Sequence, residues 1–563
     1  MNGNVVFPNV WGEGQLFVFS ALDGDSFQKN DFAGMLSKDR LGVRFYTSVI
    51  RELTFKDAFC QNLVFKAVTG DYISAKTQSG NIKVIFQDTH LIIGEFPTGN
   101  EPFVLTEGEC KREKYGNVEI QDTLDGAFTA LGVEGNKFAF AYGFTADSVK
   151  ELVNKGLKEE ISVAEEKKTA FYEKHSRPQL KNYSLLYSKF LSVMKTQLYS
   201  PEKPFDCIWS TPDRLPHRDL WLWDSVFHAI GWRHVDTKVA ESLILAVLST
   251  QKENGMIPHQ TGTTFQSDIS QPPVIAWGSW LVYEKTGNIN FLKTVYEKNL
   301  QFLKWVYSAK KIENEDLFIW NTHDDKSCRC GESGADNSPR FDDFVTLLAI
   351  DLSCYVANEM RYMSKIGKIL GEETAWFDGC FKRIKEAVNR KLWDENTQFY
   401  YDFDITNNRI QRVASVASFL PLFSGICDEV KAEMLVEHLE NPNEFCTAFP
   451  VPSISASDER YAKDMWRGPV WINLNYMIIL GLRENGFIDL AEDLTKKTID
   501  VVNEWYLKTG TVFEFYDSEN KTPPYELDRK GPVTKNYDIR RKYQSIRDYG
   551  WSCTLTLDML ENL

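Results

Sequence analysis

Carboxylates gather in the glycine-rich stretch GESGADNSPRFDD, residues 331–343, where a packed core does not need them. The turn precedes a predicted helix, which Asn337 or Ser338 followed by Pro339 can start. Asp336 is then placed to point into a pocket and act as a catalytic acid. The alternative is that Asp336 only caps the helix, and the spacing alone leaves this alternative open.

A second carboxylate lies among aromatic residues in GTVFEFYDSE, residues 510–519. Glu514 has Phe513, Phe515 and Tyr516 around it, and a carboxyl group in apolar surroundings is poorly solvated. Proteins tolerate such groups mainly at functional sites. Two carboxyl groups suit the hydrolysis of a glycosidic bond: one protonates the leaving oxygen, while the other attacks the anomeric carbon or activates water.

Further tryptophans and polar residues lie in loops that lead into other predicted helices, as Asp336 does. Aromatic faces stack on sugar C–H groups, and charged or amide side chains bind hydroxyls. We therefore expect substrate contacts from Arg218, Trp223, Asp224, His259, Gln260, Trp466, Arg467, Trp471, Asn473 and Trp551. Burial in the core is an equally good interpretation for Trp223 and its neighbour Trp221. A lone histidine such as His259 is more often structural.

From Leu180 onward, apolar residues recur every three or four positions, which predicts helices. Their expected ranges are 180–199, 222–232, 236–252, 271–286, 289–310, 340–367, 371–393, 411–423, 427–440, 468–484, 487–508 and 547–561. The connections alternate between short and long. In antiparallel helix pairs every second connection lies at the same end, so all the long loops should share one face. Six pairs closing into a ring predict an (α/α)6 barrel with a pocket at that face.

Residues 1–146 have a different pattern. Short runs rich in aromatic and β-branched residues, at 14–20, 62–70, 81–96 and 136–144, predict strands of a β-sandwich. A charged, helix-favouring stretch follows. We therefore expect a β-sandwich domain at 1–146, a helical linker at 147–178 and the catalytic barrel at 179–563.

Composition narrows the class of ligand. The net charge is −15 and 43% of the 563 residues are hydrophobic, which argues for a large core and against nucleic acid or an anionic membrane as partner. No segment approaches the roughly 18 apolar residues of a membrane span, and MNGNVVFPNVWGEG lacks the basic stretch followed by an apolar one that is typical of a signal peptide. Whether a signal peptide was removed stays open. The ten cysteines contain no C-x-x-C pair, which favours reduced thiols and a cytoplasmic location. The oligomeric state stays open.

The sequence also lacks the common cofactor signatures. It contains no cysteine-histidine cluster, no P-loop and no G-x-G-x-x-G fingerprint. The carboxylates do not follow the 12-residue pattern of a calcium loop. We therefore expect neither a cofactor nor a metal in the reaction.

Seven segments resemble, in chain order, the signature segments of glycoside hydrolase family 63. They are WLWDSVFH, GMIPHQ, SQPP, ESGADNSPR, RGPVWINLNY, FEFYDSE and YGWS, within residues 207–561. The relatives of this family include mannosylglycerate and glucosylglycerate hydrolases and, more distantly, trehalases. The resemblance implies an inverting α-glycosidase on an (α/α)6 barrel, with Asp336 as the acid and Glu514 as the base. It also implies sugar-pocket residues at Arg218, Trp223, Asp224, Trp466, Gly468, Trp471 and Asn473.

Two segments match no family segment, namely 321–330 and 522–544, and we expect them to line the leaving-group side of the pocket. The second segment and its flank carry Arg540, Arg541, Lys542 and Arg547. These cations either grip a carboxylate such as glycerate or form a basic stripe on the surface.

The expected function is exo-acting α-glucosidase-like or α-mannosidase-like hydrolysis of short α-linked oligosaccharides or glycosyl conjugates. A sugar epimerase or isomerase is the first alternative, because such enzymes normally use histidines that face the cavity, and His217, His259 and His323 lie in long loops. A non-catalytic carbohydrate-binding protein is the second. The presence of both Asp336 and Glu514 in matched places argues against it.

Overall fold

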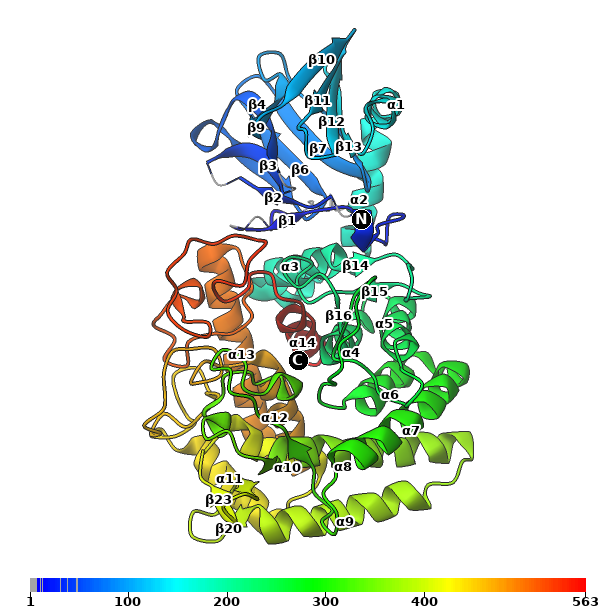
Figure 1. The fold of residues 1–563 in the computed structure, drawn as a ribbon. Helices are drawn as coiled ribbons and strands as arrows, with labels where there is room; N and C mark the ends of the chain where they lie inside the picture. The colour runs from blue at the N-terminus through cyan, green and yellow to red at the C-terminus, as the bar shows by residue number, and fades with distance from the viewer. Residues whose placement is uncertain (1–7, 11, 13, 31, 38, 47–48) are drawn as a thin grey trace. The chain divides into compact units, whose positions relative to one another are not determined.

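The computed structural model describes residues 8–10, 12, 14–30, 32–37, 39–46 and 49–563 (Figure 1). The start of the N-terminal stretch tested above for a signal peptide lies outside these residues. The chain forms two compact units. The N-terminal unit takes the chain up to Glu202 with Arg214–Pro216 and Trp505–Thr511, and the barrel unit contains Lys203–Asp213, His217–Glu504 and Val512–Leu563.

The N-terminal unit contains two antiparallel sheets. The smaller sheet has the order β1 (Leu16–Phe17), β2 (Gly34–Leu36), β3 (Arg40–Tyr46), β4 (Ile50–Phe59) and β9 (Pro102–Glu107). The larger sheet has the order β10 (Lys111–Tyr115), β11 (Val118–Asp122), β12 (Phe128–Glu134), β13 (Lys137–Gly143), β8 (Leu91–Glu95), β7 (Asn81–Asp88), β6 (Tyr72–Lys76) and β5 (Val64–Val68). Phe45 of β3 shares one core with Val84, Ile92 and Phe140 of the larger sheet. The expected β-sandwich is confirmed.

Two helices occupy the stretch that the sequence predicts as a linker, α1 (Ala146–Gly156) and α2 (Ile161–His175). The first is a packed element, because Val149 and Val153 are fully buried with Ile93 and Ala139 of the larger sheet. A further helix, α3 (Ser184–Thr196), also belongs to the N-terminal unit. The domain boundaries at 146 and 178 stay a prediction.

The barrel unit is built on a closed ring of helices. The ring consists of α4 (Leu222–Trp232), α6 (Ile275–Thr286), α8 (Ile350–Leu370), α10 (Leu420–Ser424), α12 (Ile472–Glu484) and α14 (Gly550–Glu561), and each contacts the next, with α14 returning to α4. Between them in the chain come α5 (Thr237–Ser249), α7 (Ile289–Lys310), α9 (Ala375–Lys391), α11 (Glu429–Glu440) and α13 (Ile488–Thr509). Every residue of α4 is buried. This arrangement confirms the (α/α)6 barrel.

Two expected helices differ most from the prediction. The helix expected from 340 begins at Ile350, because Leu347–Leu348 forms β19 between β18 (Ile319–Trp320) and β22 (Asp402–Asp404). The helix expected at 411–423 is reduced to a 3-10 turn, Val416–Phe419, followed by α10. In both places apolar residues at helical spacing are held by pairing between loops rather than by a helix.

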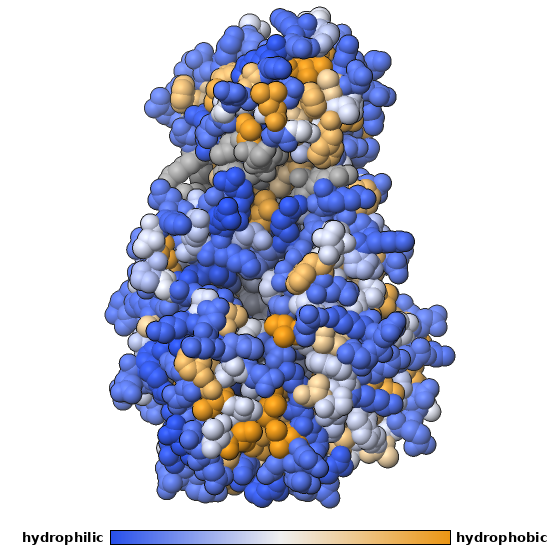
Figure 2. All heavy atoms as spheres, viewed as in Figure 1, coloured by the Kyte–Doolittle hydropathy of each residue, from blue (hydrophilic) through white to orange (hydrophobic). Residues whose placement is uncertain are grey.

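The long connections carry most of the irregular structure. Among the described residues, no helix is long and apolar enough to cross a membrane. On the face shown in Figure 2, hydrophilic residues predominate and apolar ones form scattered groups. Nine of the ten cysteines, those from Cys110 to Cys553, are free thiols.

Candidate active site

A cavity of ≈ 520 Å³ in the barrel unit joins the predicted catalytic residues. It is lined by His217, Trp221, Trp223, Asp224, Gln271, Gly331, Gly334, Asp336, Met465, Trp471, Glu514, Arg529, Lys530, Lys542, Tyr549 and Trp551. Asp336 and Glu514 come from loops far apart in the chain. Four of the predicted sugar contacts, Trp223, Asp224, Trp471 and Trp551, lie with them.

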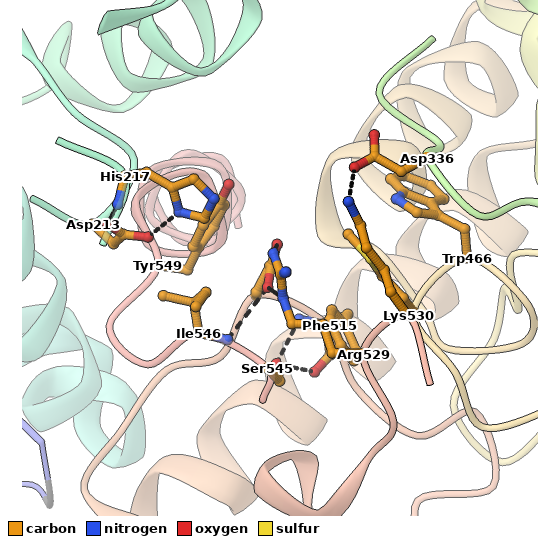
Figure 3. Close-up of polar contacts among 12 residues, drawn as sticks. Asp213, His217, Asp336, Trp466, Phe515, Arg529, Lys530, Ser545, Ile546 and Tyr549 are labelled. Carbon is orange, nitrogen blue, oxygen red and sulfur yellow. Dashed lines mark hydrogen bonds and ion pairs between the residues drawn. The ribbon is translucent and has the colours of Figure 1, made fainter. Parts of the chain in front are cut away.

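The loop before Asp336 is shaped by a close approach to an indole. Gly334 has a φ of 73°, and a Cβ there would lie 2.3 Å from Cζ2 of Trp223, so the position requires glycine. Ser338, not Asp336, is the residue that precedes the 3-10 turn at Pro339–Phe341. The Asp336 carboxylate instead pairs with Lys530, whose Nζ lies 2.6 Å from Oδ2 (Figure 3). Both side chains are 22% exposed.

Glu514 has a more enclosed environment. Its side chain is 3% exposed and that of Arg529 is 5% exposed. Arg529 donates from Nη2 to Oε1 at 3.0 Å and from Nε to Oε2 at 3.2 Å. The backbone N–H of Ile546 also donates to Oε2, at 3.3 Å. Glu514 is therefore held by a buried guanidinium fork, the geometry that fixes a carboxylate most firmly.

A third carboxyl group in the cavity, that of Asp224, has no ion pair among the described residues. It lies 2% exposed in the first turn of α4, and the Tyr549 hydroxyl donates to Oδ1 at 3.3 Å. Burial raises the pKa of Asp224 well above its usual range. A neutral Asp224 can donate a hydrogen bond to a sugar hydroxyl.

Tryptophans form an aromatic wall around these groups. Trp551 packs edge-on against Trp223 with ring centroids 5.4 Å apart and lies 5.9 Å from Trp471. Trp466 stacks on Trp471 at 3.9 Å, but it lines a neighbouring cavity of ≈ 350 Å³ that Trp223 also borders. Within the described chain, the indole N–H groups of Trp466 and Trp551 have no hydrogen-bond partner.

Some predicted contacts lie outside the cavity lining. Arg218 is exposed. His259 interacts through Nδ1 with the Ser267 hydroxyl at 2.6 Å, and Gln260 donates to Asp219 at 2.6 Å. These three side chains are engaged on or near the surface of the loops rather than in the cavity.

Three predicted residues lie at the entry to α12, and the first two of them bind other loops. Arg467 forms a fork with Asp342, at 3.1 and 2.9 Å. The backbone N–H of Gly468 donates to the Ser453 hydroxyl at 2.8 Å. Asn473 is fully buried, and neither atom of its amide has a partner among the residues described. None of the three lines the cavity.

Several residues that line the cavity are not among the predicted site residues. They include Arg529 and Lys530, which lie in the segment 522–544 that matches no family segment, and Tyr549, which lies in the YGWS motif but has no predicted role. Of the four basic residues considered for this region, only Lys542 lines the cavity. Arg540 pairs with Asp538 at 3.1 Å, Arg541 is exposed, and Arg547 stacks on Tyr537 at 4.1 Å. The signal for the two missed cations is the pair Arg-Lys directly before a glycine.

His217 also faces the cavity. Its Nδ1 lies 2.5 Å from Oδ2 of Asp213, and Figure 3 shows the pair across from Asp336 and Lys530. Burial lowers the pKa of His217, and Asp213 opposes that effect. Among the described residues, no group of His, Cys, Asp and Glu side chains has the arrangement of a metal site.

Comparisons with known proteins match this part of the chain. The family model for the mannosylglycerate hydrolase MGH1-like glycoside hydrolase domain matches residues 216–552. A mannosylglycerate hydrolase of Thermus thermophilus is 25% identical over 359 residues, which is 49% of this chain and 84% of that protein. An uncharacterised protein of Borreliella burgdorferi is 26% identical over 271 residues, 47% of this chain, so the chain spans 54% of that relative.

A solved structure gives the same fold. The crystal structure of a glycoside hydrolase family 63 mannosylglycerate hydrolase from Thermus thermophilus, in complex with Tris and D-glycerate, has a TM-score of 0.55 and 22% identity. The similarity covers 66% of this chain and 99% of that one. It supports the barrel architecture described above.

Proposed function

The chain belongs to the MGH1-like glycoside hydrolase family, and from this premise we propose that it is an inverting, exo-acting α-glycosidase. Its substrates are short α-linked oligosaccharides or glycosyl conjugates, and it acts in the cytoplasm. The observation that carries the proposal is that Asp336 and Glu514 line one cavity with Trp223, Trp471 and Trp551.

In the proposed reaction Asp336 is the general acid and Glu514 the general base. Asp336 protonates the leaving oxygen while Glu514 takes a proton from the attacking water, which requires roughly 6.5–9.5 Å between the two carboxyl groups. Oε2 of Glu514 already accepts from Arg529 and Ile546, whereas Oε1 accepts only from Arg529 in the described structure. Oε1 is therefore the oxygen that takes the proton.

The sugar that is cleaved off is held by the aromatic wall and by Asp224. Because burial raises its pKa, Asp224 can donate a hydrogen bond to a sugar hydroxyl as well as accept one. Trp223 and Trp551 supply the apolar faces.

For the leaving group we propose an anionic conjugate as one substrate class. Lys530 and Lys542 line the cavity, and the structurally similar mannosylglycerate hydrolase from Thermus thermophilus has been crystallised with Tris and D-glycerate. An ammonium group suits a carboxylate. Glucose and mannose are both candidates for the glycosyl part.

A sugar epimerase is the second candidate, and His217 is the observation that favours it. A histidine oriented by Asp213 and facing the cavity is the kind of group that moves protons at carbon. The family match favours hydrolysis.

The test is to incubate the wild type and Asp336→Asn with α-glucosyl and α-mannosyl disaccharides and glycerates, following the products by NMR. Hydrolysis by the wild type that is strongly reduced in the variant supports the proposal. An interconverted free sugar without hydrolysis moves the epimerase to first place.

A further inference from the structure

The backbone around Lys530 is anchored beside the loop of Asp336. Asp464 accepts the backbone N–H of Lys530 at 2.7 Å and that of Gly531 at 3.1 Å. The same carboxylate accepts from the Asn337 amide at 3.1 Å, and Asn337 follows Asp336 directly. Since Asp464 ties both loops together, the position of Asp336 relative to the 529–531 backbone is fixed, and only side chains are free to change partners.

The side chains of the two neighbouring cations differ in how firmly they are held. Arg529 is buried and makes two hydrogen bonds to Glu514. Lys530 makes a single ion pair with Asp336, with both side chains 22% exposed. A partly exposed pair of this kind contributes little stability, and the long lysine side chain reaches it from an anchored backbone (Figure 3). Lys530 can therefore exchange partners at low cost.

This ion pair conflicts with the role of Asp336 as an acid. A general acid must contact the leaving oxygen, whereas Oδ2 of Asp336 is occupied by the Lys530 ammonium group 2.6 Å away. The other groups near Asp336 do not resolve the conflict: burial, with help from Asp336, raises the pKa of Cys328 to about 11, and burial lowers the pKa of His259 to about 4. Both are neutral near pH 7. Arg529 adds positive charge, although it is paired with Glu514.

We propose that Lys530 is an exchangeable counter-ion that occupies Asp336 in the empty enzyme and moves to an anionic group on the leaving side of the substrate. The exchange frees the Asp336 carboxyl group to face the leaving oxygen with a proton taken from solvent. Asp336 then gives that proton to the leaving oxygen as the glycosidic bond breaks, and water gives its proton to Glu514 as its oxygen bonds to the anomeric carbon. Lys530 is thus a positioning residue for the acid and a specificity residue for the leaving group. The inference rests on the proposed function.

The first test measures binding without turnover. D-glycerate and glycerol are titrated into the full-length enzyme by calorimetry near pH 6.5. We expect the wild type to bind D-glycerate more tightly than glycerol, and Lys530→Met to bind D-glycerate about 10-fold or more weakly than the wild type. Asp336→Asn, which removes the competing carboxylate, should bind D-glycerate at least as tightly as the wild type.

The control variant is Lys535→Met, from the same segment, whose ammonium lies over the Tyr543 ring at 4.7 Å. It should behave as the wild type. The exchange is refuted if the wild type does not bind D-glycerate, if Lys530→Met binds D-glycerate as tightly as the wild type, or if Asp336→Asn binds it more weakly.

The second test uses turnover of two conjugates that differ only in charge, 2-O-α-glycosyl-D-glycerate and 2-O-α-glycosylglycerol, each as the glucoside and the mannoside. Lys530→Met should lower kcat/KM for the glycerate by about 10-fold or more and leave the glycerol conjugate equal or faster. A wild type that hydrolyses no α-glycoside refutes the proposed function. A wild type that hydrolyses both, with the same preference in Lys530→Met, refutes the exchange alone.

Discussion

The two sides of the cavity use adjacent residues, Arg529 and Lys530, to neutralise two carboxylates, yet they do so in different surroundings. On the Glu514 side the charges are 3% and 5% exposed and are joined by two hydrogen bonds. On the Asp336 side both are 22% exposed and are joined by one contact. A base needs a lasting negative charge, whereas an acid must gain and lose a proton. The difference in burial suits these two roles.

Asp224 extends the comparison to a carboxyl group with no cation. It is as buried as Glu514, but without an arginine its pKa is raised. Burial alone therefore favours the neutral acid at Asp224, whereas the Glu514 carboxyl group has a guanidinium fork beside it. The presence of a cationic partner, more than the depth of burial, distinguishes Glu514 from Asp224.

The largest predicted effects separate acid from base. Glu514→Gln should lower kcat by about 10²–10⁴-fold on glycosides and on α-glycosyl fluorides alike, because every substrate needs activated water. Asp336→Asn should lose a similar factor on glycosides but keep most activity on the fluorides, because fluoride leaves with little protonation. Steady-state rates on both substrate types measure this. Equal losses on the fluorides would remove the distinction between the two roles.

Removing the buried fork should mainly affect stability. Arg529→Met leaves Glu514 buried without its partner, and we expect a loss of about 3–5 kcal/mol in the free energy of unfolding, together with loss of activity. Arg529→Lys keeps the charge but not the planar fork, so its free energy of unfolding should lie between those of Arg529→Met and the wild type. Urea unfolding at neutral pH measures the loss. If Arg529→Met were as stable as the wild type, the buried Arg529–Glu514 pair would not be needed to stabilise the fold, contrary to this prediction.

The raised pKa of Asp224 predicts that the stability of the protein depends on pH. Its native pKa is raised, so the native state keeps a proton that the unfolded chain loses above about pH 4. The wild type therefore loses stability as pH rises from that point to the native pKa. Asp224→Asn should match the wild type near pH 4 and become more stable by up to about 1.4 kcal/mol per pH unit above it. The measurement is the free energy of unfolding of both proteins from pH 4 to 8. A difference between them that stays constant over this range would refute the prediction.

The smallest effect on stability is expected at Lys530. Its partly exposed ion pair contributes about 0–1 kcal/mol, so Lys530→Met should unfold within about 1 kcal/mol of the wild type. Urea unfolding beside Arg529→Met makes the comparison direct. A loss as large as that of Arg529→Met would show that the two sides do not differ as described.

The sequence predicts the barrel because helical spacing is a local property. The expected range 289–310 coincides with α7, and 222–232 coincides with α4. The prediction is wrong where loops pair with one another, as at Leu347–Leu348, because such contacts leave no period in the sequence. Local spacing therefore locates the helices but not the loop-to-loop sheets.

The residues of the candidate site also fall into two groups, those that sequence motifs predict and those that only the fold brings together. Asp336 and Glu514 lie in recognisable motifs, and both line the cavity. Arg529 and Lys530 lie outside any motif, and their partners are 15 and 194 positions away in the chain. Only the fold brings these charges together. The roles of all four stay predictions until variants are measured.

The anomeric form of the first sugar released tests the central claim most directly. An α-linked substrate that the wild type cleaves is followed by NMR within the first minutes, before mutarotation mixes the anomers. Asp336 as acid and Glu514 as base for water predict release of the β-anomer, with release strongly reduced in both Asp336→Asn and Glu514→Gln. Release of the α-anomer first would contradict the account, because it requires a covalent intermediate that this pair of roles does not form.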